Sequence, residues 1–291
     1  MKKIKVGIIG TGNIGCDLLV KIQNSQLLEC SLFMGRNFES RGMIFANKAG
    51  IKITDRSIQE LIDNPNLCDI VFDATTASTH IKHAEILKSL NKFTIDLTPS
   101  LVGKMCVPSV NGETCIKENN INMITCGGQA TIPIIHTISK IVPNIEYVEI
   151  VASISSNSAG PGTRANIDEF TQTTKAAIEK FSNVNNTKAI IILNPSDPPI
   201  MMHNTIYIKA KNVNINDVEY AIKKIEARMQ KYIKGYKITK GPIYIDDKII
   251  IMVQVEGNGD YLPKYSGNLD IITASAVEVA EMYAKEVLNA K

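Results

Sequence analysis

The chain lacks any hydrophobic segment long enough to cross a membrane. Crossing a bilayer takes about 20 consecutive apolar residues, and the apolar stretch after Met1-Lys2-Lys3 is too short for a secretory signal. These absences argue against membrane insertion and against export. We therefore expect a cytoplasmic protein.

The cysteine spacings and charge clusters that mark metal and nucleic-acid sites are also missing. No two cysteines form a CxxC pair, and no histidine lies near one of them in the sequence, so we expect neither a metal site nor a disulfide framework. A net charge of +3 with scattered lysines does not suggest nucleic-acid binding. The expected free thiols are Cys16, Cys30, Cys68, Cys106, Cys115 and Cys126.

What the chain does contain is material for a large core, with 291 residues of which 44% are hydrophobic. Two domains are typical at this size. Up to about residue 125, short apolar runs alternate with helical patterns, which indicates an α/β, doubly wound parallel sheet of Rossmann type. The expected strands are residues 4–9, 32–34, 51–53, 70–74, 93–97 and 121–125, and helices at 40–49, 58–62 and 81–90 lie between them.

The second half of the chain has longer strands rich in β-branched residues, which predicts an α+β domain. The expected strands are 145–155, 188–193, 205–210, 243–245 and 249–256, with helices at 167–181 and 217–233. We expect a dinucleotide-binding domain over residues 1–128 and the α+β domain over 129–270. A final helix within 271–291 should pack back on the first domain.

A glycine-rich turn follows the first apolar run directly. Gly10 allows a tight turn, Gly12 lets the backbone approach a pyrophosphate, and Gly15 lets the next helix pack closely on the strand. The strand, turn and helix context favours dinucleotide binding over a purely structural turn. The full segment is Gly10, Thr11, Gly12, Asn13, Ile14 and Gly15.

Small polar residues follow two of the expected strands, at 73–79 and 96–100. Ligands of open parallel sheets bind outside the carboxyl ends of the strands, so these clusters are candidate walls of a cofactor or substrate site. Hydroxyl-rich segments also serve as simple helix caps. Both interpretations remain open on the sequence.

One cysteine, Cys126, lies at a joint between an expected strand and an expected helix. Unpaired backbone N–H groups and the positive end of the helix dipole at such a joint lower a thiol pKa and hold an adjacent oxyanion. The alternative is a buried apolar filler. Gln129 is close enough in sequence to orient a substrate, or it is only a polar residue of the first turn.

Beyond these motifs, the chain resembles the acylating acetaldehyde dehydrogenases that partner 4-hydroxy-2-oxovalerate aldolases in the meta-cleavage pathways of aromatic hydrocarbon catabolism. The resemblance covers almost the whole chain and is carried by GTGNIG, FDATTAS, DLTPS, TCGGQATIP, IVASISSNSAGPGTRANIDEFT, NPSDPP and YLPKYSGNLDI. It implies a semialdehyde dehydrogenase-like fold with a catalytic and dimerisation domain. It also implies a homodimer within a larger complex that includes the aldolase.

The resemblance implies an activity: acetaldehyde, NAD and coenzyme A give acetyl-CoA and NADH through a thioester on Cys126. On physical grounds alone, the loop of small residues at 155–166 is either a connector or a cofactor site. The resemblance makes it a second NAD segment beside the one at 11–14, with Asn268 as a further contact. The residues implied in that segment are Ser158, Ala159, Gly160, Pro161, Gly162, Thr163, Arg164, Ala165 and Asn166.

One departure from the family concerns the residue that would act as a base. Family members usually carry an aspartate where this chain has Asn204, and an amide cannot take a proton as a carboxylate does. We hypothesise that Cys126 relies on the helix terminus or on His203, although His203 reads more readily as an ordinary surface histidine. Asn204 also keeps open a catalytically weakened NAD-binding subunit that stabilises or regulates its aldolase.

Two further departures concern the cofactor and the assembly. Arg36 stands at the end of the second strand, where an acidic residue would bind the adenosine ribose, and an arginine there accommodates a 2′-phosphate. NADP is therefore an option beside NAD. A tight hairpin at 246–248 replaces a longer family segment. One alternative reaction is that of a dehydrogenase that passes its acyl group to phosphate, which would need a phosphate-binding arginine such as Arg164. One alternative substrate is propanal, which differs from acetaldehyde by a single methylene.

Overall fold

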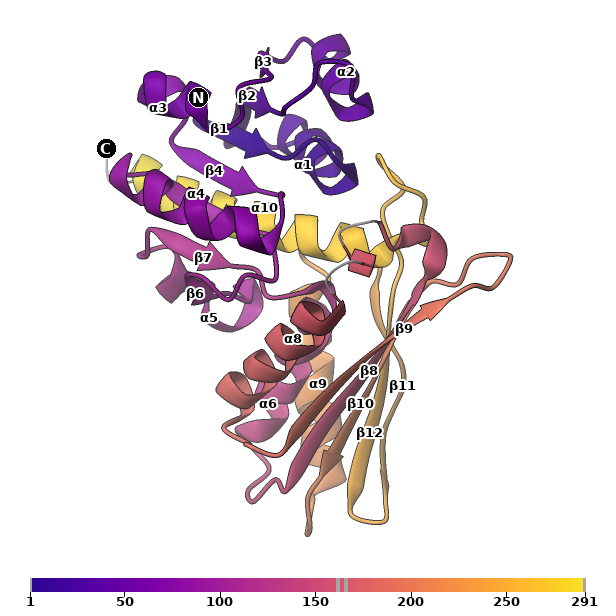
Figure 1. Cartoon of the computed structure of the whole chain (residues 1–291). Helices are drawn as coiled ribbons and strands as arrows, with labels where there is room; N and C mark the ends of the chain where they lie inside the picture. Colours follow the sequence, from indigo (N-terminus) through magenta and orange to yellow (C-terminus); the bar gives the residue numbers. More distant parts are fainter. Residues whose placement is uncertain (1, 161–162, 165–166, 290–291) are drawn as a thin grey trace. The chain divides into compact units, whose positions relative to one another are not determined.

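The computed structural model describes residues 2–160, 163–164 and 167–289, which form two compact units (Figure 1). The first unit contains residues 1–123 and 273–291, and the second contains residues 124–272. The division between these units falls between Met123 and Ile124, a few residues before the expected junction at 128. All of α6 (Cys126–Ser139) belongs to the second unit, where it packs on α8, β8 and β10.

The first unit is built on a seven-stranded sheet in the order β3-β2-β1-β4-β5-β7-β6, in which every paired strand is parallel. This confirms the predicted doubly wound sheet. The strand order reverses beside β1, between β2 and β4, and ligands of such sheets bind at that point. The strands are β1 (Ile4–Ile9), β2 (Leu28–Met34), β3 (Ile53–Thr54), β4 (Ile70–Asp73), β5 (Phe93–Asp96), β6 (Lys104–Met105) and β7 (Asn120–Asn122).

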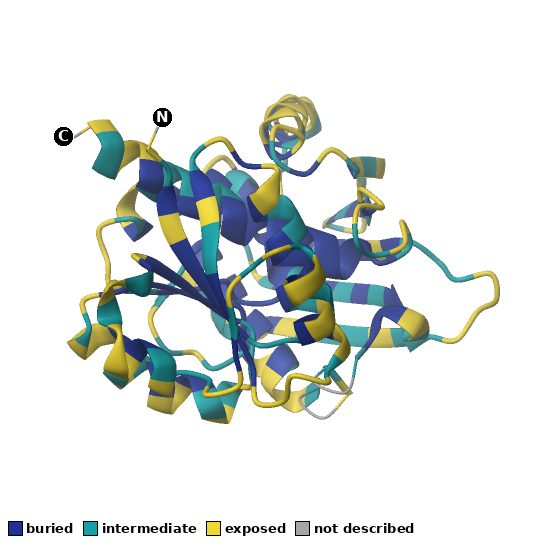
Figure 2. Cartoon of the chain, turned by 90° about the horizontal axis from the view of Figure 1, so that it is seen from above, coloured by how far each residue is buried: buried dark blue, intermediate teal, exposed yellow. Residues whose placement is uncertain are grey.

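Helices connect these strands, and the strands are buried because helices cover the sheet. All four residues of β4 and all four of β5 are buried, and Figure 2 shows the dark blue strands beneath more exposed helices and loops. The helices are α1 (Asn13–Gln23), α2 (Arg41–Lys48), α3 (Gln59–Asp63), η1 (Pro65–Leu67), α4 (Ala77–Ser89) and α5 (Pro108–Cys115).

The short helix η1 is absent from the sequence expectations, and so are β6 and α5. Strand β6 has two residues, and α5 contains a non-helical Asn111, so neither leaves a periodic pattern long enough to detect. Strand β2 begins at Leu28 and not at Leu32. Its first residues are polar and apolar in alternation, which masks a strand that becomes fully buried only at its carboxyl end.

The second unit has a mixed five-stranded sheet in the order β11-β12-β10-β8-β9, in which only the β8–β9 pairing is parallel. The predicted α+β domain is confirmed. Helix α6 contacts α8 and α9 as well as the sheet. The elements are β8 (Tyr147–Ser155), η2 (Ser156–Ser158), α8 (Ile167–Ser182), β9 (Thr187–Asn194), β10 (Met202–Lys209), α9 (Ile215–Met229), β11 (Tyr236–Ile245) and β12 (Lys248–Val255).

The expected tight hairpin joins β11 to β12. Ile245 pairs with Lys248 across a two-residue turn, and both turn residues have positive φ, +49° at Asp246 and +58° at Asp247. These angles are those of the type I′ turn that matches the twist of paired strands. The prediction of a tight connection is confirmed.

The last helix, α10 (Gly267–Asn289), starts within the second unit and belongs to the first from Thr273 onward. Glu281 accepts a hydrogen bond of 2.5 Å from Ser25 Oγ. The Tyr283 ring stacks on Phe93 at a centroid distance of 4.2 Å. No helix among the described residues is long and apolar enough to cross a bilayer.

Candidate active site

The glycine turn between β1 and α1 is closed on one side and open on the other. Gly10 has a φ of +115°, which glycine adopts readily, and a Cβ there would lie 2.5 Å from Ala74 O. A Cβ on Gly15 would lie 2.0 Å from Gly10 O. Around the corresponding position of Gly12, no described atom beyond its chain neighbours lies within 4 Å. The open side of the turn can therefore admit a ligand at Gly12.

The first turn of α1 presents an anion site. Gly12 is the N-cap, no side chain caps the helix, and no acidic residue lies in its first turn. Backbone N–H groups at such a terminus bind phosphate, and the helix dipole favours the negative charge. Asn13 is exposed and Ile14 is half-buried at this terminus, while Thr11 precedes it in the turn.

Arg36 lies on the segment that follows β2 and is exposed. The nearby α2 begins close to the glycine turn, because a Cβ on Gly42 would lie 2.1 Å from Thr11 O. Ser40, the N-cap of α2, reaches Thr11 Oγ1 at 3.4 Å. The adenosine end of a dinucleotide at this edge would meet a guanidinium where an acidic side chain would select the ribose hydroxyls.

Cys126 is the first residue of α6 and is half-buried. The chain enters the helix through Ile124, whose φ of +64° is unfavourable for a β-branched residue. Strain of this kind costs on the order of 1–3 kcal/mol and is concentrated at functional sites. The backbone before Cys126 is thus held in a conformation that only the surrounding structure stabilises.

Thr125 caps α6 through a chain of hydroxyl groups. Its Oγ1 accepts a hydrogen bond of 3.0 Å from the Gly128 N–H and lies 2.8 Å from Thr174 Oγ1. Because the Thr174 hydroxyl donates to Phe170 O at 2.7 Å, the proton between the two threonines comes from Thr125. Each hydroxyl then has a single orientation, and the terminus that carries Cys126 is fixed.

Burial dominates the acidity of the Cys126 thiol. It raises the pKa of Cys126 to about 12, and the backbone N–H groups of Gly127 and of Cys126 itself act in the opposite direction without offsetting it. The expectation that the helix terminus lowers this pKa is therefore wrong in its net direction. The N–H groups are in place as predicted, but desolvation of the thiolate is the larger effect.

Asn204 is brought to the same region by the register of the second sheet. It pairs with Ala152 of β8 and Val253 of β12, and the Ala152 Cβ lies 3.5 Å from the position of a Cβ on Gly127. Asn204 is 1% exposed, and neither polar atom of its side chain has a hydrogen-bond partner among the described residues. A buried unpaired amide costs about 1–3 kcal/mol, so it calls for a ligand or a functional reason.

Gln129, which follows Cys126 in α6, is buried, whereas His203, which precedes Asn204 in β10, is exposed. Gln129 is fully buried, and its backbone N–H donates to Thr125 O at 2.9 Å. His203 alternates with Asn204 along β10 and is exposed, with Nδ1 donating to Met201 O at 2.9 Å. The hypothesis that His203 activates Cys126 is not supported by this geometry, and the surface histidine is what the structure shows.

The loop after β8 is held by its own arginine. Arg164 Nη2 donates to Ser156 O at 2.9 Å and its Nε donates to Ala159 O at 3.0 Å. Ser158 Oγ donates to Ser155 O at 2.9 Å. These contacts give Arg164 a structural task within the loop, in place of the phosphate site that a phosphate-accepting dehydrogenase would need.

Asn268 reaches this loop from the start of α10. Its Nδ2 donates to Ser158 O at 3.5 Å, and its buried Oδ1 has no hydrogen-bond partner among the described residues. No described atom beyond its chain neighbours crowds the Cβ position of Gly160, and Thr163 is half-buried. Four of the residues predicted for this segment lie outside the described residues, namely Pro161, Gly162, Ala165 and Asn166.

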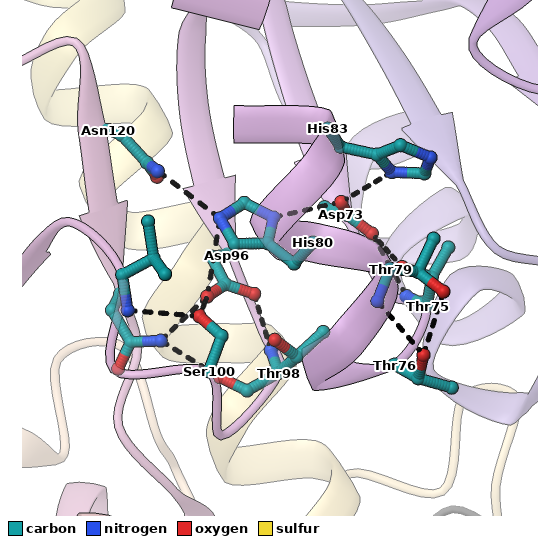
Figure 3. Close-up of polar contacts among 12 residues, drawn as sticks. Asp73, Thr75, Thr76, Thr79, His80, His83, Asp96, Thr98, Ser100 and Asn120 are labelled. Carbon is teal, nitrogen blue, oxygen red and sulfur yellow. Dashed lines mark hydrogen bonds and ion pairs between the residues drawn. The ribbon is translucent and has the colours of Figure 1, made fainter. Parts of the chain in front are cut away.

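A buried polar network at the carboxyl ends of β4 and β5 escaped residue-level prediction (Figure 3). It contains Asp73, His80 and Asp96, all fully buried. The polar clusters after these strands were visible in the sequence, and Thr76 does cap α4 by accepting from the Thr79 N–H. The sequence signal that was missed is a histidine, His80, seven residues after the aspartate that ends the expected strand.

Comparison with known proteins agrees with this architecture. Residues 5–118 match the model described as semialdehyde dehydrogenase, NAD binding domain, and residues 126–263 match prokaryotic acetaldehyde dehydrogenase, dimerisation. An acetaldehyde dehydrogenase of Pectobacterium atrosepticum is 49% identical over 97% of this chain and 96% of its own length. An acetaldehyde dehydrogenase of Geobacillus stearothermophilus is 50% identical over 100% of this chain and 99% of its own length. The chain belongs to the acetaldehyde dehydrogenase family.

Solved structures support the fold. An aspartate semialdehyde dehydrogenase II of Vibrio cholerae, crystallised with its ligand ASA, matches with a TM-score of 0.67. The match covers 98% of this chain and 99% of that one at 15% identity, which shows a shared fold and nothing about the substrate. The predicted semialdehyde dehydrogenase-like architecture is confirmed.

Proposed function

We propose that this chain is an NAD-dependent, CoA-acylating acetaldehyde dehydrogenase in which Cys126 is the nucleophile. The observation that carries the proposal is the placement of a cysteine as the first residue of α6, in a chain about half identical to named acetaldehyde dehydrogenases along its whole length. Cysteine thiolates at helix termini form acyl intermediates whose oxyanions backbone N–H groups stabilise.

The glycine turn fits a dinucleotide. The open side at Gly12 and the uncapped first turn of α1 give a pyrophosphate both space and N–H donors. When bound, NAD supplies the hydride acceptor. Residues 11–14 would hold it, together with the described part of the second segment (Ser158, Ala159, Gly160, Thr163 and Arg164) and Asn268.

The chemistry on the protein begins when the Cys126 sulfur attacks the aldehyde carbonyl carbon and gives a thiohemiacetal. The N–H groups at the start of α6 stabilise its oxyanion. Loss of hydride from that carbon leaves a thioester on Cys126. The thiol of coenzyme A then attacks the thioester carbonyl, acetyl-CoA departs, and the Cys126 thiol is restored.

Asn204 and Gln129 are the side chains we assign to orientation of the aldehyde. The unpaired amide of Asn204 offers both a donor and an acceptor in a buried place beside the first turn of α6. A neutral amide cannot act as a base, so it aligns the carbonyl without removing a proton. Since one methylene is worth about 1–3 kcal/mol of discrimination, these contacts select acetaldehyde over propanal only weakly.

NAD and NADP differ in the 2′-phosphate that NADP carries. Arg36 supports use of NADP beside NAD, because a guanidinium at the end of β2 pairs with a phosphate where a carboxylate would repel it. Initial rates with both cofactors test this. Replacement by Arg36→Asp should lower kcat/KM for NADP about tenfold or more while that for NAD changes little; equal losses for both would remove Arg36 from cofactor selection.

For the assembly, we propose a homodimer through the open face of the second sheet, with an aldolase of the 4-hydroxy-2-oxovalerate class as a further partner. The helices cover one face only, and on the other Val151, Tyr207 and Ile250 line a depression of about 460 Å³. Ile245 and Met252 on the hairpin strands are 55% and 38% exposed. Apolar surface of this kind is typical of interfaces between subunits.

The test is NADH formation from acetaldehyde and NAD, with and without coenzyme A, in the wild type and in Cys126→Ser. We expect turnover that needs both coenzyme A and Cys126, with NADH binding unchanged in the variant. Turnover without coenzyme A that releases acetate would contradict the acylating reaction. Binding of NADH without any turnover would favour the alternative of a weakened subunit that stabilises a partner aldolase.

A further inference from the structure

Two buried carboxylates face each other at the edge of the sheet in the first unit. Asp73 ends β4, Asp96 ends β5, and the two are register partners on neighbouring parallel strands. Both are fully buried. Two charged carboxylates so placed repel each other strongly unless a cation lies between them.

His80 occupies that place. Its Nδ1 lies 2.9 Å from Asp73 Oδ2, and its Nε2 lies 3.4 Å from Asp96 Oδ2. His80 belongs to α4, and its side chain is fully buried. Figure 3 shows the imidazole between the two carboxylates. A second histidine, His83, places its Nδ1 2.8 Å from the same oxygen of Asp73. Among the described residues, His80 therefore differs from His83 in two contacts of its Nε2, one with Asp96 and one with the side-chain amide of Asn120 at 3.2 Å.

Each carboxylate also holds the segment that follows its strand. Asp73 Oδ1 accepts from the Thr75 N–H at 3.1 Å and from the Thr75 hydroxyl at 2.5 Å. Asp96 accepts from the Thr98 N–H at 2.7 Å and from Ser100 Oγ at 2.6 Å. The orientation of both segments thus depends on these two side chains.

The first of these segments borders the glycine turn. Ala74 N donates to Ile9 O at 2.8 Å, and Ala74 O is the atom that a Cβ on Gly10 would strike. Strand β4 is the neighbour of β1 on the side where the strand order reverses, which is the place where dinucleotides bind in open sheets. A shift of the segment after β4 would displace the turn that receives the pyrophosphate.

We propose that His80 is a positioning residue for cofactor binding: as an imidazolium between Asp73 and Asp96, it holds the segments 74–76 and 97–100 in the arrangement that receives the dinucleotide. The inference rests on the proposed function, which supplies the cofactor. Among the described residues no group of three or more His, Cys, Asp or Glu side chains is arranged to hold a metal ion.

The charges agree with this arrangement. Burial opposes the charge of His80, but the hydrogen bond to Asp73 and the charge of Asp96 outweigh it, so that the pKa of His80 is raised. Burial also acts against the charge of Asp73, and the hydrogen bonds from His80 and His83 outweigh it, so that the pKa of Asp73 is lowered. The titratable groups facing His80 are Asp73 and Asp96, with His83 across Asp73. From β7 the uncharged amide of Asn120 lies 3.2 Å from His80 Nε2, and the imidazolium requires that the amide oxygen of Asn120, which is otherwise without a partner among the described residues, face this nitrogen.

The test measures NADH dissociation constants by fluorescence over a range of pH in the wild type, His80→Gln and the matched control His83→Gln. We expect NADH affinity of the wild type to fall as pH rises and His80 loses its proton. His80→Gln should bind NADH about tenfold more weakly, with little pH dependence, and His83→Gln should stay close to the wild type.

A double variant separates charge from shape. In His80→Gln the two carboxylates face each other without a cation between them. Adding Asp96→Asn removes one charge and keeps an oxygen for the Thr98 N–H, so we expect NADH affinity to recover most of the loss. A structural role for the imidazole as a space-filling group would give no such recovery.

Several outcomes would overturn the inference. These are an NADH affinity of His80→Gln within twofold of the wild type, an equal loss in His83→Gln, and a double variant no better than the single one. Should His80→Gln fail to fold, Asp96→Asn alone decides, because loss of that charge must move the pH dependence of NADH affinity to lower pH. No NADH binding by the wild type would overturn the proposed function itself, which is a distinct result.

Discussion

The two units bury polar groups in opposite ways. In the first unit, the carboxylates of Asp73 and Asp96 are buried together with the cationic partner His80 and with hydrogen-bond donors for their oxygens. In the second, the thiol of Cys126 and the amide of Asn204 are neutral, and the amide has no partner among the described residues. Satisfied buried charges fix a backbone, whereas an unsatisfied buried dipole is available to a ligand.

The largest effect that tests this contrast is the reactivity of the thiol. Because burial raises the pKa of Cys126 to about 12, the thiolate fraction should rise about tenfold per pH unit, or roughly 10⁴-fold between about pH 6 and pH 10. The rate of Cys126 alkylation should follow it without a plateau. Iodoacetamide labelling followed by peptide mass spectrometry measures this rate, and Cys126→Ser gives the background of the other thiols.

A plateau in labelling near neutral pH would contradict a neutral site. It would mean that a positive group or a base lowers the thiol pKa, as the sequence alone suggests for a cysteine at a helix terminus. The second unit would then hold its nucleophile beside a charged group, as the first unit holds its carboxylates beside His80.

The next effect concerns the unpaired amide. Asn204→Leu should lower kcat/KM for acetaldehyde about a hundredfold, because the substrate loses a hydrogen-bonding partner. The same change should raise the free energy of unfolding by about 1 kcal/mol, since it removes an unsatisfied buried dipole. Steady-state kinetics and urea unfolding measure the two effects on one protein.

The decisive feature of the Asn204→Leu prediction is that kcat/KM falls while the free energy of unfolding rises. The control is Thr205→Val, which changes the adjacent position on the half-exposed face of β10 and should leave both quantities nearly unchanged. If Asn204→Leu instead destabilised the protein by several kcal/mol, the amide would be a satisfied structural group and its assignment to substrate orientation would fail.

Sequence reasoning succeeded where a pattern is local. Burial on both faces makes continuous apolar runs, so β1 was predicted at its observed bounds. The short connection at 246–248 between two expected strands likewise predicted a tight hairpin. The position of Cys126 at the start of a helix followed from the helical spacing of the apolar residues after it. Each of these features depends on neighbours within a few residues.

The remaining features depend on contacts between distant residues. The net pKa of Cys126 is set by how much of unit 2 excludes water from it, and no motif encodes that. The ion pairs of His80 require β4 and β5 to be adjacent with Asp73 and Asp96 in register. Likewise, Asn204 approaches the first turn of α6 only through its register with Ala152.

The charged unit should give the protein a distinctive pH dependence of stability. Burial raises the pKa of Asp96 to about 6, so the folded state binds this proton more tightly than the unfolded chain. The contribution is fully present below about pH 4 and is lost as pH rises through about 6, an effect on the order of 2–3 kcal/mol. The raised pKa of His80 extends the decline above pH 6.

Urea unfolding at about pH 4.5 and about pH 7 measures this decline, and Asp96→Asn isolates it from other groups that titrate in the same range. The variant should show a much smaller difference between the two conditions. The lowered pKa of Asp73 does not interfere, because its contribution is constant above about pH 4. A wild type that becomes more stable over this range would contradict the raised pKa of the buried Asp96.

The smallest effect tests how the neutral unit fixes its nucleophile without charges. Thr125→Val removes the hydroxyl that accepts from the Gly128 N–H and donates to Thr174, so the free energy of unfolding should fall by about 1–2 kcal/mol. Thr125→Ser keeps the hydroxyl and should lose less than half of that. Because the cap orients the terminus that carries Cys126, kcat should fall with stability in Thr125→Val and recover in Thr125→Ser. A loss of stability without a loss of kcat would mean that the strained turn at Ile124 holds the cysteine in place by itself.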